Sequence, residues 1–315
     1  MEEKSNINLA PSDEYMTVVY KHPAMTICEE NNFKYVKVTE DIKFGELLLV
    51  EHVYASESHI CYMIVRYNEY IFDQYHPRKI KFKDIANMDE KDISIMVNDK
   101  ISHNCFGYGE KCKLLTDTIT KLNHSCNQNC AVYINVSYKI EGTNIVFMEL
   151  YAIQNIKKDS EITISYGPET SHKRDFVCNC GKSLNQRRKH FNIVSRLVSS
   201  LSRNINNKVR LKIYNYIQST KARRVMMNHY LANNGIIVNN NKIVAYTENG
   251  MKMINKLFYK IMGMKMDQEN VDSSNNIINL IKTTTFMSIL ETYFLSNGDV
   301  ENLNSDNNLT CSQKT

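Results

Sequence analysis

The sequence predicts an α+β protein in which a mostly β part comes first and an α-helical part follows. Up to about residue 165, short runs of β-branched, aromatic and aliphatic residues recur between turns, in part with the period of two that is typical of half-buried strands. Beyond about residue 185, apolar residues recur at helical spacing. The 315 residues, 43% hydrophobic and 23% charged, suffice for one large globular domain or two smaller ones.

The first part is expected to consist of short strands joined by turns. A turn over 41–45 precedes one strand, and Glu141-Gly142-Thr143 joins two others into a hairpin. Residues 107–109 are expected to form a loop, and Phe82 to Val97 one or two short helices. The expected strands cover residues 16–20, 35–39, 46–51, 131–136, 144–150 and 162–165.

The second part is expected to be helical, with asparagine-rich loops over 204–207 and 239–241. It shows no repeat of the length of a tetratricopeptide unit. The expected helices cover residues 196–201, 209–217, 225–231, 251–262 and 277–294.

Composition narrows the classes of protein. The net charge of +5 permits an acidic partner without demanding one, and no apolar run is long enough to cross a membrane. The first residues are acidic and polar, so we expect no signal peptide. Nine cysteines, without a secretory signal, favour reduced thiols over a disulfide framework. We therefore expect an intracellular protein of the cytoplasm, the nucleus or both.

Two motifs stand out, and their order matters. Residues 122–130 read Leu-Asn-His-Ser-Cys-Asn-Gln-Asn-Cys, and residues 161–167 read Glu-Ile-Thr-Ile-Ser-Tyr-Gly. Together they resemble the SET domain of protein lysine methyltransferases. Asn104-Cys105-Phe106 and Asn129-Cys130 resemble, more narrowly, its SET–MYND or split-SET subgroup. The resemblance covers roughly residues 33–180.

The resemblance implies a mostly β SET core of short twisted strands with few helices, followed by the α-helical C-terminal region. Its domain over 16–185 would hold a variable insert over 52–103 and a post-SET-like segment over 170–185. The insert has a single cysteine, so it lacks a MYND zinc finger. The other expected parts are a polar arm over 1–15, the helical region over 186–297 and a disordered tail over 298–315.

The same resemblance implies transfer of a methyl group from S-adenosylmethionine to a lysine of a histone or another protein. Asn123 and His124 would hold the amino acid part of the cofactor, and Asn104 would be a further contact. Tyr166 would bind the cofactor and act as the catalytic residue. Taken singly, an Asn more often holds a turn, and a strand-end Tyr is more often simply half-buried.

One departure from the family pattern bears on the cofactor. Before the first core strand, where the family has Gly-x-Gly, this sequence has Phe33-Lys34-Tyr35. Lys34 and Tyr35 are the corresponding cofactor-binding positions, but neither allows the close backbone approach that glycine does. The alternative function is therefore a non-catalytic SET-like binding module with weakened cofactor binding.

A structural zinc ion is also implied. Phe176-Val177-Cys178-Asn179-Cys180 resembles the post-SET element, in which the phenylalanine packs on the adenine and the cysteines bind zinc. By analogy the ligands would be Cys126, Cys178 and Cys180. Structural zinc takes four ligands, and the position expected for the fourth is Ser183. Buried thiols without a metal are the alternative.

Basic residues gather in the helical part. A solvated helix face accounts for them better than a dock for nucleic acid or an acidic protein tail, because the charges are scattered along the sequence. The expected partner is thus a lysine-bearing protein, with nucleic acid less favoured and no membrane. The residues are Arg187, Arg188, Lys189, Arg196, Arg203, Lys208, Arg210, Lys212, Lys221, Arg223 and Arg224.

Overall fold

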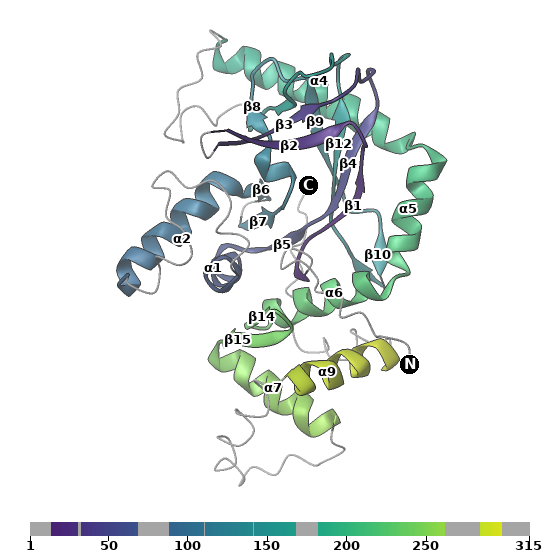
Figure 1. The fold of residues 1–315 in the computed structure, drawn as a ribbon. Helices are drawn as coiled ribbons and strands as arrows, with labels where there is room; N and C mark the ends of the chain where they lie inside the picture. Colours follow the sequence, from purple (N-terminus) through teal and green to yellow (C-terminus); the bar gives the residue numbers. More distant parts are fainter. Residues whose placement is uncertain are drawn as a thin grey trace.

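The computed structural model describes residues 14–30, 33–68, 88–109, 111–140, 142–167, 182–261 and 284–297. The α+β class is confirmed: short strands fill the first part and helices dominate the second (Figure 1). The helices are α1 (Ser58–Tyr67), α2 (Glu90–Asn104), the 3₁₀ turn η4 (Ile119–Lys121), α4 (Leu184–Arg203), α5 (Asn207–Ile217), α6 (Thr220–Asn233), α7 (Glu248–Ile261) and α9 (Thr284–Asn297).

The strands form several small sheets around one four-stranded antiparallel sheet of order β1-β4-β12-β9. The strands are β1 (Thr17–Lys21), β2 (Met25–Glu30), β3 (Phe33–Val38), β4 (Leu47–His52), β5 (Tyr54–Glu57), β6 (Phe106–Tyr108), β7 (Cys112–Leu115), β8 (Asn123–His124), β9 (Cys130–Asn135), β10 (Lys139–Ile140), β11 (Thr143–Asn144), β12 (Phe147–Ala152), β13 (Thr163–Ile164), β14 (Ile236–Asn239) and β15 (Lys242–Tyr246).

Strand β12 lies at the centre of this sheet, and all six of its residues are buried. On one face Met148 and Leu150 join the largest apolar cluster. On the other, Phe147 and Tyr151 pack with Val198 of α4, which lies along β9 and β12 (Figure 1). A strand that is covered on both faces reads as a continuous apolar run rather than an alternating one.

Most predicted elements are present, and the structure adds others that were not predicted, among them β2, β5, β7 and α1. Two predictions of loop and helix also need correction. Residues 107–109 were predicted as a loop, and that prediction is wrong for the first two, since β6 pairs with β7 through Phe106, Gly107 and Tyr108. The region predicted as helical also contains the hairpin β14–β15. Its turn is the asparagine-rich stretch expected as a loop, where Asn240 and Asn241 have φ values of 51° and 56°.

The first residues of the described chain pack against the second part. Tyr15 is fully buried, and its hydroxyl accepts from the Val238 N–H at 2.8 Å and donates to the Val238 carbonyl at 3.0 Å. Asn228 of α6 donates to the carbonyl of Glu14 at 3.1 Å. These bonds join the start of the β part to α6 and the β14–β15 hairpin.

Two further findings concern membranes and thiols. Among the described residues, no helix combines the length and apolarity that a membrane crossing requires. Of the six cysteines described, five are free thiols, while Cys112 is in a disulfide, so the expectation of reduced thiols is wrong at that residue.

Candidate active site

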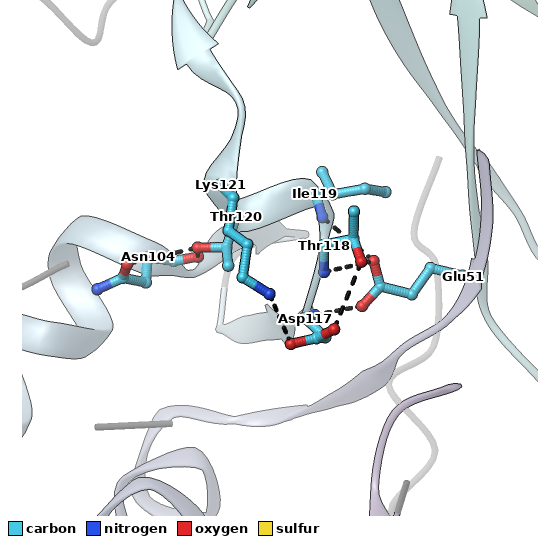
Figure 2. A network of polar contacts seen from close by, with 7 residues as sticks. All are labelled: Glu51, Asn104, Asp117, Thr118, Ile119, Thr120 and Lys121. Atoms are coloured by element: carbon cyan, nitrogen blue, oxygen red, sulfur yellow. Dashed lines mark hydrogen bonds and ion pairs between the residues drawn. The ribbon is translucent and has the colours of Figure 1, made fainter. Parts of the chain in front are cut away.

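A tight turn leads into the first motif and is held by a buried carboxylate. Glu51, on β4, has no exposed surface, and its carboxylate accepts from the backbone N–H groups of Asp117, Thr118 (3.1 Å) and Ile119 (3.2 Å) (Figure 2). Burial, and secondly the charge of Asp117, raises the pKa of Glu51 to about 7. The carboxylate supplies the partners that the first N–H groups of η4 lack within the turn.

The same turn reaches α2 on its other side. The hydroxyl of Thr120 donates to the main-chain carbonyl of Asn104 at 2.9 Å, as Figure 2 shows. Asn104 ends α2, is buried, and its amide nitrogen donates to the Lys100 carbonyl at 2.8 Å. Asn104 therefore holds the end of a helix, which is the structural role that a lone Asn suggests, while it also borders the cavity described below.

The two motifs meet side by side. Strand β8 pairs in parallel with β13, so that Asn123 lies opposite Thr163 and His124 opposite Ile164. The Asn123 amide nitrogen donates to the Glu161 carboxylate at 2.6 Å. Motifs that are separated in sequence thus form one unit.

A second asparagine ties the same segments together. The Asn129 amide nitrogen donates to the Glu161 carbonyl at 2.7 Å, and its amide oxygen accepts from the Thr163 N–H at 2.8 Å. A side-chain amide can donate and accept at once, so one asparagine can hold both sides of a backbone segment.

His124 links the first motif to Tyr166. The backbone N–H of Tyr166 donates to His124 Nδ1 at 3.2 Å, and the two rings lie 5.2 Å apart. Because Nδ1 accepts this bond, the proton of the neutral ring lies on Nε2. That nitrogen lies 3.2 Å from Cys126 Sγ and donates to it. The side chain of His124 thus orders the motif internally.

The hydroxyl of Tyr166 donates to the main-chain carbonyl of Leu122 at 2.7 Å. Its ring packs against the main apolar cluster. Tyr166 and Asn104 lie on the wall of one cavity of about 50 Å³, which α2, β6 and η4 also border. The residues lining it are His103, Asn104, Cys105, Phe106, Gly107, Thr120 and Tyr166.

Lys34 and Tyr35 lie in regular strand β3, opposite Glu29 and Cys28 of β2. The pairing of β2 with β3 is uninterrupted, and Phe33 and Tyr35 stand in it where the family pattern has glycine. Further along β3, the Val36 carbonyl accepts from the Ile162 N–H at 2.7 Å. The strand therefore runs beside the second motif.

The post-SET-like segment falls outside the described residues, and Phe176, Cys178 and Cys180 with it. Cys126 is described and buried. Ser183 has a clear structural role: it begins α4 with a capping box, in which its hydroxyl accepts from the Gln186 N–H at 3.3 Å. The described residues contain no group of three or more side chains that could hold a metal ion.

The polar groups present suit the amino acid part of S-adenosylmethionine. Among the described residues, the Asn123 amide oxygen has no recorded partner, so it can accept from an ammonium group. The cavity beside Tyr166 combines polar groups with the ring of Phe106, but its volume would hold only part of the cofactor.

The sequence did not single out four residues that shape this site: Glu51, Thr120, Asn129 and Lys182. Asn129 stood inside the first motif, so its position was a usable signal. Glu51 and Thr120 act through backbone groups brought close only by the fold, and no local pattern marks them. Lys182 was missed for the same reason: its ammonium group donates to the Cys126 carbonyl at 3.0 Å.

Comparison with known proteins agrees with this geometry. Residues 34–167 match the family model described as SET domain. A protein of Acanthamoeba polyphaga mimivirus, named as a candidate SET domain-containing protein, is 46% identical over 279 residues, which cover 89% of this chain and 86% of that protein. A solved structure of a candidate histone methyltransferase from Plasmodium falciparum is 23% identical, with a TM-score of 0.28, over 46% of this chain and 95% of that one, a likeness too weak to use. The match to the family model and the identity with the viral protein show that this chain belongs to the SET-domain family.

Proposed function

We propose that this protein transfers a methyl group from S-adenosylmethionine to the ε-amine of a lysine in another protein, a histone or a non-histone protein. The observation that carries the proposal is the junction of the two motifs. There the paired strands β8 and β13 bring Asn123, His124 and Tyr166 together. The proposed catalytic domain covers 16–185, with the helical region over 186–297 behind it.

The cofactor would supply an electrophilic methyl group on a positively charged sulfur, which the lysine nitrogen attacks. Tyr166 can orient that nitrogen. Its hydroxyl hydrogen is donated to the Leu122 carbonyl, so its oxygen presents only lone pairs to a ligand. An amine N–H that donates to this oxygen has its own lone pair turned elsewhere, and methyl C–H groups can make weak contacts with the same oxygen.

Asn123, Asn104 and the backbone at His124 would bind the cofactor. Further proposed contacts are Lys34, Tyr35 and Phe176. The substrate lysine must arrive deprotonated, and a channel that excludes water lowers the pKa of its ammonium group without a dedicated base.

The second candidate function is a binding module without catalysis, and the unbroken strand through Phe33-Lys34-Tyr35 favours it.

Calorimetric titration with S-adenosylmethionine tests the first half of the proposal. Methyl transfer from labelled cofactor to a protein extract tests the second, with a matched extract whose lysines have been blocked by reductive methylation. Label on the untreated extract and none on the blocked one is the expected result. Cofactor binding without transfer would favour the binding module. Absence of cofactor binding by the folded protein would refute the methyltransferase.

A further inference from the structure

Charge is distributed very unevenly along this chain. Residues 182–247 contain thirteen lysines and arginines and no aspartate or glutamate. The rest of the chain has 26 basic and 34 acidic residues, which gives it a net charge of −8. The net charge of +5 for the whole protein is therefore the sum of one strongly basic segment and an acidic remainder. The basic segment includes α4 and α5.

The fold turns these charges outward. Helix α4 packs on the sheet through Val194 and Val198. Lys189, Arg196 and Arg203 are exposed and recur every seven residues, opposite those buried positions. Seven residues are about two turns, so successive charges stand about 10.5 Å apart along one line of the helix. Charges that the sequence scatters are thus aligned by the helix.

The next helix carries exposed basic residues too. Lys208 and Lys212 of α5, one turn apart on one side of that helix, are exposed as well. Figure 1 shows α4 and α5 following one another along the outside of the sheet. We name these five residues, Lys189, Arg196, Arg203, Lys208 and Lys212, the α4–α5 basic face, and none of them forms an ion pair with another described residue. By contrast, Arg224 on α6 pairs with Glu291 of α9 at 2.6 Å.

Neutral polar side chains lie between the charges. Asn192 and Ser200 are exposed on the same side of α4 as Arg196. Amide and hydroxyl groups together with Lys and Arg are the side chains that contact phosphate and sugar in nucleic-acid complexes. Apolar side chains are exposed on the same two helices, namely Phe191, Ile193, Leu211 and Tyr214. Apolar groups beside basic ones would also suit a membrane surface, so the experiment below includes vesicles as an alternative outcome. A compact acidic peptide would need charges closer together than this spaced line.

We propose that the α4–α5 basic face binds the phosphate backbone of double-stranded nucleic acid without sequence preference. The straight line of charge along α4 suits a polymer that carries a regular row of phosphates, and the face has neither the loops nor the glycines of a small-anion site. The face begins close to the site, since Lys182, just before α4, donates to the Cys126 carbonyl. The inference does not depend on the methyltransferase activity.

Fluorescence anisotropy with a labelled thirty-base-pair DNA duplex tests the proposal at several salt concentrations. Five phosphate contacts predict a slope of log affinity against log salt of roughly −4.5. The variant Lys189→Glu, Arg196→Glu, Arg203→Glu should lose at least about tenfold in affinity and about three units of slope. A matched variant, Lys139→Glu, Lys242→Glu, Lys256→Glu, changes the net charge equally at exposed residues elsewhere. It should lose much less.

Three results would overturn the proposal. They are no duplex binding by the wild type at low salt, equal losses in the two variants, and tighter binding of polyglutamate than of duplex at equal charge. The last would point to an acidic protein partner instead. Sedimentation with anionic vesicles in the absence of duplex binding would point to a membrane surface. Thermal unfolding of both variants checks that each is folded.

Discussion

Glu51 Oε2 lies 3.1 Å from the backbone nitrogen of Thr118, and through this bond the central sheet holds the turn that precedes the first motif. Two residues further on, Thr120 holds the end of α2, and Leu122 accepts the hydroxyl of Tyr166. The candidate catalytic tyrosine is therefore supported by a segment whose start depends on one buried carboxylate.

The first prediction concerns pH and Glu51. The pKa of Glu51 is about 7 in the folded protein, whereas an exposed glutamate has an ordinary pKa of 4.5. The folded state therefore binds the proton of Glu51 more tightly than the unfolded state does. This raised pKa contributes stability that is fully present below pH 4.5 and is lost as the pH rises through 7. The loss amounts to up to about 3 kcal/mol, at about 1.4 kcal/mol for each pKa unit.

Glu51→Gln removes this ionisation. The free energy of unfolding of wild type relative to the variant should therefore fall between pH 5 and 8, as measured by urea unfolding at each pH. Asp117 and Lys121, paired at 2.9 Å, are the charged groups nearest the carboxylate and are unchanged in both proteins. Parallel stability curves would mean that Glu51 does not titrate in this range.

The second prediction concerns Tyr166. Tyr166→Phe should keep the ring packed and the cofactor bound but lower the rate of methyl transfer by roughly 10²–10³, the size of the loss when one preorganised polar contact is removed. The loss should appear in turnover rather than in cofactor affinity, because the contact matters mainly in the transition state. Single-turnover transfer measures it.

Tyr214→Phe is the matched control for this variant, since the Tyr214 side chain is 59% exposed on α5. Its rate should equal that of the wild type. Equal transfer by Tyr166→Phe would return Tyr166 to a structural role, in which its hydroxyl serves only the Leu122 carbonyl.

The third prediction concerns Asn123. Asn123→Ala should weaken S-adenosylmethionine binding by about 1–3 kcal/mol, because the charged part of the cofactor loses a hydrogen-bond partner. Glu161→Gln is the control, since the Gln carbonyl can still accept from Asn123 and should preserve most of the affinity. Calorimetry on both variants decides. Unchanged affinity in folded Asn123→Ala would remove this residue from the site.

A fourth prediction concerns zinc. We expect at most one structural metal ion per chain, held by Cys126, Cys178 and Cys180. Elemental analysis of protein purified without added metal measures the ion. Thiol titration under native conditions should then find these three cysteines protected, and Cys126→Ser should release the metal. A metal-free protein whose three thiols all react would exclude the site.

The sequence predicted more of the fold than of the candidate site. The strand patterns over 131–136 and 144–150 and the helix pattern over 209–217 predicted β9, β12 and α5, because local periodicity reports which face is buried. The β14–β15 hairpin was missed, although Asn240 and Asn241 tolerate positive φ, the backbone that such a turn needs. Its short apolar runs are equally compatible with helix.

The site was foreseen only where motif residues touch one another. The pairing of β8 with β13 follows from two motifs that can be recognised in the sequence. The contact of Glu51 with Thr118 spans 67 positions, and that of Tyr15 with Val238 spans 223. Contacts of this kind are set by the whole packing of the chain, and no periodic pattern encodes them.

Two buried histidines lie where the central sheet meets α6. His52 of β4 and His229 of α6 have rings 5.2 Å apart, and His229 Nε2 donates to the Tyr15 carbonyl at 2.6 Å. Burial lowers the pKa of His229 to about 4, and burial together with the charge of His229 also lowers that of His52. The other titratable groups in ring contact with the pair are Tyr54 and Tyr216, and neither is an acid that would stabilise a charged ring.

The last prediction is that lowering the pH reduces the free energy of unfolding through His229, which is the opposite of the effect of Glu51. A folded pKa of about 4 against an ordinary value of 6.5 gives stability that is present above pH 6.5 and lost as the pH falls towards 4. The loss is up to about 3 kcal/mol for His229. Between pH 4.5 and 6.5 the two groups act in opposite directions. The free energy of unfolding of the wild type should therefore depend less on pH than that of either variant.

His229→Gln keeps an N–H for the Tyr15 carbonyl and removes the titration. Its free energy of unfolding relative to wild type should rise as the pH falls from 7 to 4.5, whereas that of Glu51→Gln should fall over the same range. Urea unfolding of the three proteins side by side measures both slopes, and slopes of the same sign would contradict the assignment of one group or the other.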